Sequence, residues 1–367
     1  MSTNLSFSND NRIYGIDLMR IFTMYMVVLL HVFGHGGILN ACEKNSVNYF
    51  VSWFFEAAAY CAVNCYALIS GYVGVKSKHK YSNIINLTLM VIFYMVLSTT
   101  LFYFFVPDTA TAKDILAALN PFSAKACWYF AAYFGIFFLM PFMNKLLLSL
   151  SKKEAKLLSA TIIVVFSIMP YVLDIDVFKT SWGYSTIWLM MLYLLGGCIR
   201  LFSDEIPDKK PKYIIIFILC AALAVFSKYS NILKSTLITY IYPTTLLSAI
   251  MLLFIFSKVS VKSTSAKKAI MFFSPLTFGI YVIHTEHYVW HNILSKAFAN
   301  FASLNVVLLV IYALLAAAII FLICALIDYL RLLLFKLLRI KKGCELLVEK
   351  LRPVSNKIAA LVLKLLC

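Results

Sequence analysis

The segment YGIDLMRIFTMYMVVLLHVF (residues 14–33) decides the fold class. Only Asp17, Arg20 and His31 in it carry a charge or titrate near neutral pH, and about 20 mostly apolar residues suffice for a helix to cross a bilayer. Similar apolar runs recur along the chain. They predict an all-α, polytopic membrane protein with about ten transmembrane helices, near residues 14–33, 48–70, 83–106, 126–144, 157–173, 184–199, 213–227, 237–257, 270–290 and 305–327.

The composition of the whole chain agrees with this interpretation. Of its 367 residues, 62% are hydrophobic and 13% are charged, and the mean hydropathy is +0.88. Soluble domains are closer to one-half apolar and one-quarter charged. Ten spans use about 200 residues, which leaves no room for a large soluble domain. An ordinary soluble enzyme is therefore excluded.

The basic residues predict the orientation in the membrane. The chain has 33 Lys and Arg against 16 Asp and Glu, a formal net charge of +17. With ten alternating spans, 25 of the 33 lie on the side of the N-terminus and seven on the opposite side. Because cytoplasmic loops carry the excess of Lys and Arg, both termini are predicted to be cytoplasmic. Topology thus accounts for the charge, and no nucleic-acid partner is expected.

The composition changes near residue 328. Residues 328–367 are rich in leucine and contain nine basic residues, with Gly343 and Pro353 expected to break the segment into short helices. Such cationic amphipathic helices are typical of segments that lie on an anionic leaflet. We therefore expect two parts, a transmembrane domain over residues 1–327 and a cationic amphipathic cytoplasmic tail over residues 328–367.

Ionisable residues inside predicted spans are candidates for function, because charge in hydrocarbon costs several kcal/mol. Arg20 and His31 are eleven residues apart, which on a helix gives the same face and a separation of about 16 Å. This spacing is comparable to an extended pantetheine arm, although a histidine near a helix end is also a common interfacial residue. The full set is Asp17, Arg20, His31, Glu56, His284, Glu286 and His287.

Four segments together resemble the acyltransferase family 3 membrane proteins. The first span, with Arg12, Asp17 and the Arg20-x10-His31 spacing, is similar to the first span of that family. The other three follow in the family's order, and their order carries the resemblance. They are AVNCYALISGY (62–72) with Ser70, Gly71 and Tyr72; CWYFAAYFGIFFLMP (127–141) with Trp128 and Tyr129; and SPLTFGIYVIH (274–284) with Gly279, Tyr281 and His284.

The resemblance implies a membrane O-acyltransferase of a bacterial cytoplasmic membrane. Its donor is expected to be cytoplasmic acyl-CoA, usually acetyl-CoA, and its acceptor a hydroxyl of a sugar, a cell-surface polysaccharide or a related carbohydrate. His31 is the expected general base, since imidazole exchanges protons near neutral pH, and a transient acyl-His31 remains an alternative. Arg20 is assigned to the donor phosphates, and Asp17 to the orientation of Arg20.

The remaining motif residues are assigned more loosely. Ser70 and Gly71 are placed near the donor, and the acceptor site is expected to contain Trp128, Tyr129, Tyr281 and His284. A glycine at a helix end and an interfacial aromatic belt are the simpler structural explanations. His284, His287 and His291 would offer a metal at most two ligands from one helix, because positions i and i+7 are about 10 Å apart. No metal is expected.

A transporter or flippase for a glycan or lipid-linked substrate is the competing function. Ten spans with buried charges would also suit such a protein. Transporters usually contain two related halves or paired interrupted helices, and the sequence shows neither. The acyltransferase is therefore the favoured prediction.

Overall fold

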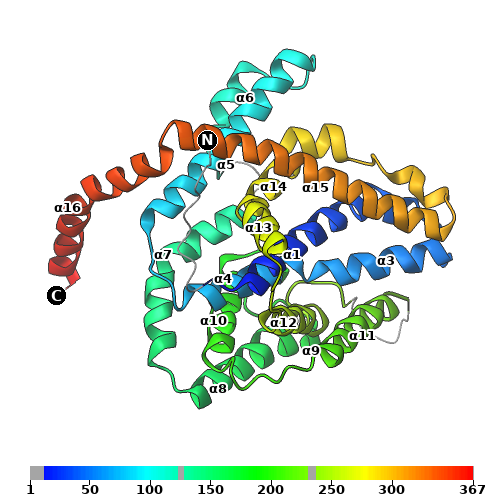
Figure 1. The fold of residues 1–367 in the computed structure, drawn as a ribbon, viewed down its shortest axis with the longest axis horizontal. Helices are drawn as coiled ribbons and strands as arrows, with labels where there is room; N and C mark the ends of the chain where they lie inside the picture. Colours follow the sequence, from blue (N-terminus) through cyan, green and yellow to red (C-terminus); the bar gives the residue numbers. More distant parts are fainter. Residues whose placement is uncertain (1–11, 123–127, 230–236, 367) are drawn as a thin grey trace.

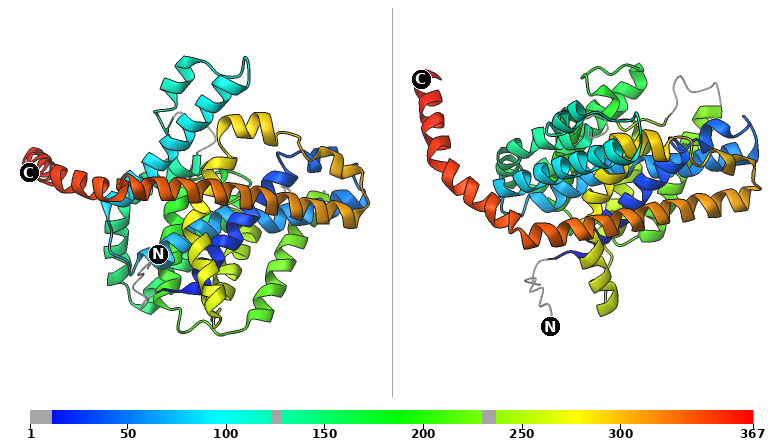
Figure 2. Two further views of the ribbon diagram at one scale, coloured as in Figure 1. Left: turned by 45° about the horizontal axis from the view of Figure 1, so that its top comes forward. Right: turned by 90° about the horizontal axis from the view of Figure 1, so that it is seen from above.

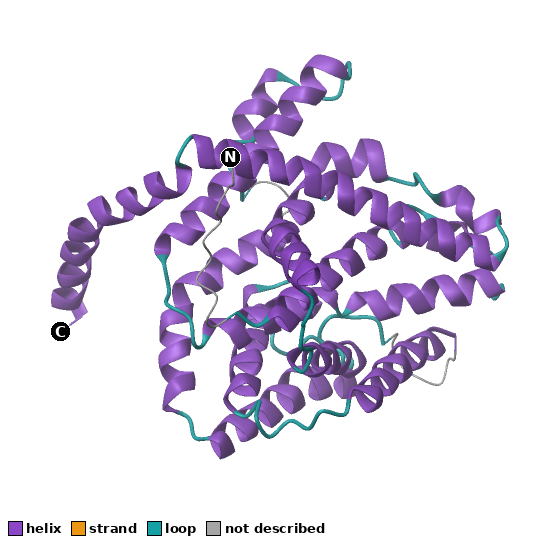
Figure 3. Ribbon diagram, in the orientation of Figure 1, coloured by secondary structure: helices purple, strands orange, loops and turns teal. Residues whose placement is uncertain are grey.

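A computed structural model describes residues 12–122, 128–229 and 237–366, with residues 359–366 described by their backbone only. These parts of the chain form helices joined by short connections, with no strand among them (Figures 1 and 3). Helices satisfy their backbone hydrogen bonds internally, which is the requirement for crossing lipid. The predicted all-α class is confirmed.

Eight helical segments of the described residues are long and apolar enough to cross a membrane. Two further apolar helices, Thr186–Leu201 and Pro243–Ser257, are shorter, at 16 and 15 residues. The chain is therefore a multi-pass membrane protein, and the predicted number of ten depends on these two short helices. The eight segments are Tyr14–Ala41, Val47–Gly74, Tyr81–Phe105, Trp128–Ser149, Lys152–Leu173, Lys210–Lys228, Thr264–His284 and Val306–Leu337.

The helices are numbered in chain order (Figure 1). They are α1 (Tyr14–Phe33), α2 (Ile38–Ala41), α3 (Val47–Tyr60), α4 (Ala62–Gly74), α5 (Tyr81–Phe105), α6 (Ala112–Ala117), α7 (Trp128–Ser149), α8 (Lys152–Ile163), α9 (Met169–Leu173), α10 (Thr186–Leu201), α11 (Lys210–Tyr229), α12 (Pro243–Ser257), α13 (Thr264–Phe273), α14 (Thr277–His284), α15 (Val306–Leu337) and α16 (Ile340–Leu366). Two π-helical turns, Val164–Ile168 and Val289–Leu294, interrupt this pattern.

Helix α1 lies in the interior of the bundle. It contacts α3, α4, α12, α13, α14 and α15. Its buried residues, such as Ile16, Met19, Val28 and Phe33, occur on most sides of the helix, and Phe22 is exposed, which is the pattern of a largely enclosed helix. The Arg20-to-His31 face therefore meets protein rather than lipid.

Helices α4 and α10 approach closely through glycines. A side chain on Gly71 would overlap the backbone of Tyr193, and one on Gly196 would overlap the backbone of Leu68. Small residues allow helix backbones to pack at short distance inside membranes. On the outside of the bundle, large apolar side chains such as Phe142 and Leu326 are exposed, as expected for a surface in contact with lipid.

The C-terminal segment leaves the bundle. Helix α15 continues without a break through residue 328, and α16 begins in contact with α5 and then extends away from the bundle as a curved arm (Figure 2). Gly343 and Pro353 lie inside α16, so the expected division into short helices is wrong. Leu, Lys and Glu are strong helix formers, and a proline inside a helix produces a kink more readily than an end when its neighbours favour helix.

Candidate functional site

Two separate cavities lie along α1. The histidine cavity, of about 1000 Å³, is lined by His31, Glu56, Trp128, Tyr281 and Trp290 among others. The basic cavity, of about 520 Å³, is lined by Arg12, Asp17, Arg20, Lys76 and Arg200 among others. Arg20 and His31 belong to the same helix, so α1 contributes one residue of interest to each cavity.

A hydrogen bond joins His31, in the wall of the histidine cavity, to His284, which is buried behind that wall and is not among the lining residues. His31 Nδ1 lies 2.9 Å from His284 Nε2, and His284 Nδ1 lies 2.5 Å from the carbonyl oxygen of Ile280. A carbonyl oxygen only accepts, so in neutral rings His284 Nδ1 carries the hydrogen and His284 Nε2 is an acceptor. His31 Nδ1 therefore donates. The lone pair of His31 Nε2 remains free for proton transfer.

Trp290 holds the end of α1 in place. Its ring stacks on His35, with centroids 3.8 Å apart, and meets the edge of the His31 ring at 4.7 Å. The Trp290 carbonyl oxygen lies 2.8 Å from His35 Nε2. The π-helical turn that carries Trp290 thus fixes His31 of α1 and His35 of the connection that follows it.

The connection after α1 binds the segment that follows this turn. Lys296 N donates to the His35 carbonyl at 3.0 Å, and Phe298 N donates to the Gly36 carbonyl at 2.9 Å. Gly37 has φ +92°, a conformation that glycine adopts without strain, and its Cα lies close to Lys296. The glycines after His35 therefore allow the two segments to meet.

Aromatic side chains form much of the wall of the histidine cavity. Trp128 and Tyr281, both predicted for the acceptor site, line it, and so do Tyr184 and Tyr240. The Trp128 ring lies 4.7 Å from that of Tyr184. Cys127, the first residue of the motif that contains Trp128, lies outside the described residues.

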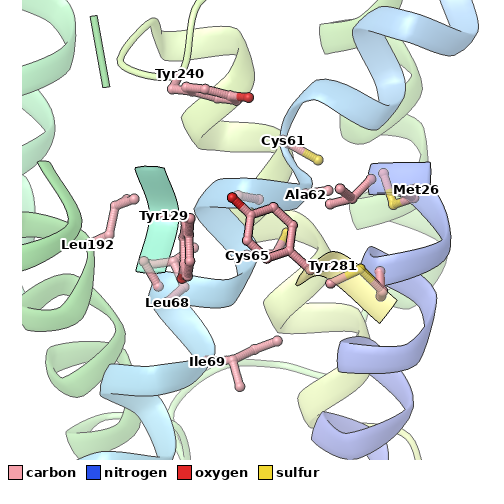
Figure 4. Close-up of a cluster of buried hydrophobic side chains, with 14 of the residues drawn as sticks. Met26, Cys61, Ala62, Cys65, Leu68, Ile69, Tyr129, Leu192, Tyr240 and Tyr281 are labelled. Atoms are coloured by element: carbon pink, nitrogen blue, oxygen red, sulfur yellow. The ribbon is translucent and has the colours of Figure 1, made fainter. Parts of the chain in front are cut away.

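Tyr129 belongs to the described lining of neither cavity and lies in a series of three tyrosines that leads from Tyr66 to Tyr281 in the wall of the histidine cavity. The Tyr66 hydroxyl donates to the carbonyl of Arg20 at 2.7 Å, and the Tyr129 ring lies 6.4 Å from Tyr66 and 6.2 Å from Tyr281. Figure 4 shows Tyr129 and Tyr281 facing each other beside Cys65 of α4. The Tyr129 hydroxyl is buried and has no hydrogen-bond partner among the described residues.

Asp17 organises the basic cavity. Its carboxylate accepts hydrogen bonds from Arg12 Nε at 2.5 Å, Arg20 Nη1 at 2.7 Å and Ser274 Oγ at 3.0 Å. The predicted ion pair between Asp17 and Arg20 is present. One carboxylate therefore orients two guanidinium groups and offsets part of their charge.

Positive charge exceeds negative charge in the basic cavity. Its lining contains Arg12, Arg20, Lys76 and Arg200 against the single carboxylate of Asp17. Arg200, which the sequence analysis did not select, donates from Nη1 to the Tyr72 hydroxyl at 3.2 Å. Its position at the end of an otherwise apolar run was the available signal. Such a set of guanidinium and ammonium donors suits phosphate groups.

Ser70 and Gly71 take part in helix packing. Ser70 Oγ donates to the carbonyl of Tyr66 at 2.8 Å, and Gly71 contacts the backbone of α10. The described lining of the basic cavity includes the next two residues, Tyr72 and Val73, but neither Ser70 nor Gly71. The Ser-Gly-Tyr motif therefore contributes to this cavity through its tyrosine.

A family model described as an acyltransferase domain matches residues 13–328, which include the described lining of both cavities except Arg12. The chain belongs to acyltransferase family 3. No curated protein and no solved structure matches the chain. The match covers all four motif segments, so the acyltransferase is recognised through nearly its whole length.

The matched region of the acyltransferase ends at a buried ion pair. Asp328 accepts from Arg331 Nη2 at 2.8 Å and from the Tyr94 hydroxyl at 2.7 Å. A side chain on Gly279 would overlap the Asp328 carboxylate. Gly279 therefore allows α14, which carries His284, to pack against α15.

Three carboxyl groups that the resemblance did not explain, those of Glu56, Asp114 and Glu286, line the histidine cavity of the acyltransferase. Glu286 accepts from Ser98 Oγ at 2.5 Å and from Tyr288 N at 2.9 Å, whereas Glu56 Oε2 has no hydrogen-bond partner among the described residues. His287 and His291 also line this cavity. Within the described residues, no group of three or more His, Cys, Asp or Glu is arranged to hold a metal ion.

Proposed function

We propose that this acyltransferase moves an acetyl group from acetyl-CoA to a hydroxyl group of a sugar or a cell-surface polysaccharide. The observation that supports this most strongly is that α1 carries Arg20 in a cavity rich in positive charge and His31 in a second, aromatic cavity. Eleven residues of helix separate the two by about 16 Å. This distance suits a donor whose phosphates and thioester are joined by a pantetheine arm.

In this proposal the donor phosphates bind in the basic cavity. Arg20 and Arg200 supply forked donors, and Lys76 supplies a further positive charge. The pantetheine arm then follows α1 past Tyr66 and Tyr129, and the thioester lies beside His31. The unpartnered Tyr129 hydroxyl is a hydrogen-bond group available to the amides of the arm.

His31 acts as the general base. Its Nε2 takes the proton of the acceptor hydroxyl, the hydroxyl oxygen attacks the thioester carbonyl carbon, and the carbon–sulfur bond breaks. The departing thiolate of coenzyme A then receives the proton from the His31 imidazolium. His284 accepts the Nδ1 hydrogen of His31 and so stabilises that imidazolium, which favours direct transfer over an acyl-His31 intermediate.

The acceptor binds in the histidine cavity. Trp128 and Tyr281 offer flat apolar faces, and the carboxyl groups of Glu56 and Glu286 offer hydrogen-bond acceptors. This combination of a few polar groups with aromatic walls suits a sugar, which has apolar C–H faces and a rim of hydroxyls.

We place both termini and the basic cavity on the cytoplasmic side of a bacterial membrane, where acyl-CoA is available. Most Lys and Arg of the chain fall on that side under the positive-inside rule. Residues 1–327 then form the transmembrane domain. Beyond it, α16 lies on the anionic inner leaflet, with exposed apolar residues such as Leu347 and Leu351 toward the lipid.

The test is coenzyme A release from acetyl-CoA by the purified protein in liposomes, with and without a panel of sugars. Native protein is compared with His31→Ala and Arg20→Ala. We expect acceptor-dependent release that His31→Ala abolishes, and a higher acetyl-CoA requirement in Arg20→Ala. Equal release by all three proteins would refute the assigned roles. Movement of an unmodified glycan without consumption of acetyl-CoA would instead establish a transporter or flippase.

A further inference from the structure

Glu56, on α3, is a buried carboxyl group with one oxygen that has no hydrogen-bond partner among the described residues. The residue is 5% exposed, and the oxygen without a partner is Oε2. Burial of such a group without a partner costs about 1–3 kcal/mol, and more when it is charged. A side chain kept at this cost in a cavity wall indicates a ligand that supplies the missing hydrogen bond.

No hydrogen bond or ion pair among the described residues satisfies Glu56 Oε2. Lys228 interacts with Glu56 through its charge, but its Nζ lies over the Trp53 ring, 3.6 Å from the centroid. The other two carboxyl groups of the cavity have hydrogen-bond partners. Glu286 accepts from a hydroxyl and two backbone N–H groups, and Asp114 accepts from the backbone N–H and the hydroxyl of Thr111. Glu56 is therefore the carboxyl group of this cavity that has a hydrogen bond to offer a ligand.

Gly34 brings this carboxyl group next to α1. A Cβ atom on Gly34 would lie 3.4 Å from Glu56 Oε1, so the glycine leaves room for the carboxyl group beside the backbone. Gly34 follows His31 by three residues, about 4.5 Å along the helix axis. Both Glu56 and His31 line the histidine cavity. The carboxyl group thus lies within about one helical turn of the proposed base.

We propose that Glu56 anchors the acceptor by accepting a hydrogen bond from a second hydroxyl group, close to the hydroxyl that His31 deprotonates. This inference rests on the proposed function and adds the acceptor class to it, a polyol with at least two neighbouring hydroxyls. Glu56 binds the acceptor but leaves the reacting atoms to His31. By fixing one hydroxyl, it decides which other hydroxyl receives the acyl group.

The experiment changes the protein and the acceptor separately and together, as in a double-mutant cycle, with the full chain in liposomes. The acceptors are the methyl glycosides of glucose, galactose, mannose and N-acetylglucosamine, with the monodeoxy derivatives of whichever is acetylated. With native protein, one deoxy derivative should lose about tenfold in kcat/KM, the size of one hydrogen bond to a carboxylate. With Glu56→Ala, the same derivative should lose less than about threefold, because the bond is already absent.

The KM for the acceptor and the KM for acetyl-CoA together distinguish acceptor binding by Glu56 from a structural role. Glu56→Ala should raise the acceptor KM about tenfold and leave the acetyl-CoA KM within about twofold, and Glu56→Gln should recover part of the loss. Glu43→Ala, an exposed glutamate just before α3, serves as the matched control and should change neither constant. Where Glu56→Ala fails to fold, the nearly isosteric Glu56→Gln carries the same comparison.

Several outcomes would overturn the inference. If each deoxy derivative lost the same factor in kcat/KM with Glu56→Ala as with native protein, Glu56 would bind no hydroxyl. A parallel rise of both KM values would make Glu56 a structural residue. If native protein hydrolyses acetyl-CoA but acetylates none of the glycosides, the polyol class is wrong. If native protein does not consume acetyl-CoA at all, the proposed function itself fails.

Discussion

His31 and His284 are 253 positions apart in the sequence and share a hydrogen bond of 2.9 Å between Nδ1 and Nε2. The bond from His284 Nδ1 to the carbonyl of Ile280 sets the direction of this pair, because it forces His284 Nε2 to accept. The pair therefore leaves the opposite nitrogen of His31 without a bond to His284. In the proposed mechanism this nitrogen is the base and His284 is a positioning residue.

His284→Ala should lower kcat about 100-fold, because His31 loses the partner that holds its tautomer and stabilises its imidazolium. His284→Gln, which keeps a hydrogen-bond acceptor, should recover part of this activity. The measurement is coenzyme A release at saturating acetyl-CoA. The double variant His31→Ala with His284→Ala should be no worse than His31→Ala alone, and independent, multiplying losses would contradict the pair.

Arg20→Ala and Arg200→Ala should each raise the acetyl-CoA KM about tenfold, because each removes a charge-assisted bond to a phosphate. Acetyl-pantetheine lacks the nucleotide and its phosphates, so its KM should be the same in native protein and variants. Steady-state kinetics with both thioesters make the comparison. Equal effects on the two donors would place Arg20 and Arg200 at the thioester rather than at phosphates.

Gly279→Ala should destabilise the protein by about 2–3 kcal/mol, because its methyl group would overlap the Asp328 carboxylate, which is held by Tyr94 and Arg331. Gly343→Ala is the matched control, since nothing lies within 4 Å of the methyl group it adds to α16. Thermal unfolding in detergent should show a lower Tm for Gly279→Ala and an unchanged one for Gly343→Ala. Similar Tm values for both would argue against the Gly279–Asp328 contact.

Acidification should weaken the fold through His79, which lies between the spans that end at Gly74 and begin at Tyr81. Burial lowers the pKa of His79, whose ring lies 4.3 Å from that of Phe137. The pKa of His79 in the folded protein is lower than its unfolded value of about 6.5. The stabilisation that neutral His79 gives the fold is therefore fully present above about pH 6.5 and is lost as the pH falls through the folded pKa. The Tm of His79→Gln should therefore fall less between pH 7 and pH 5 than that of native protein.

Anionic lipid should protect α16 from amide hydrogen exchange. Exchange over residues 340–358 should be slower in phosphatidylglycerol liposomes than in phosphatidylcholine liposomes, and high salt should remove the difference. Replacing Lys341, Lys342 and Lys350 by glutamine should weaken the binding of α16 to the anionic surface by about 1 kcal/mol for each charge removed. The protection from exchange should decrease accordingly. Equal exchange in both lipids would show that α16 does not bind the anionic surface.

The sequence predicted what depends on local pattern. Hydrophobic runs located the apolar helices, because lipid imposes the same length and composition on any span. The spacing of Arg20 and His31 predicted their common face, because helix geometry fixes it. The ion pair of Asp17 with Arg20 followed from the same geometry. Helix α16 was predicted less well, because its strong helix-forming residues keep the segment helical at Gly343 and Pro353.

What depends on tertiary contacts was out of reach. The bond between His31 and His284 requires α1 and α14 to meet, and no local pattern specifies that contact. Arg200 reaches the basic cavity only because α10 packs on α4, where Gly71 and Gly196 remove the obstructing side chains. The same packing takes Ser70 and Gly71 into a helix contact. Tyr129, predicted for the acceptor site, is absent from the described lining of both cavities and forms a partition with Tyr66.

That partition has a consequence for the cell. An energy-transducing membrane stores energy as an electrochemical gradient of protons, and any continuous water column through a protein would discharge it. Here the two cavities are lined by different residues, and the rings of Tyr66 and Tyr129 belong to neither described lining. In the proposed function, a slender donor arm that passes these rings would fill the gap it opens. An acyl group would then be passed along α1 while the membrane stays sealed to ions.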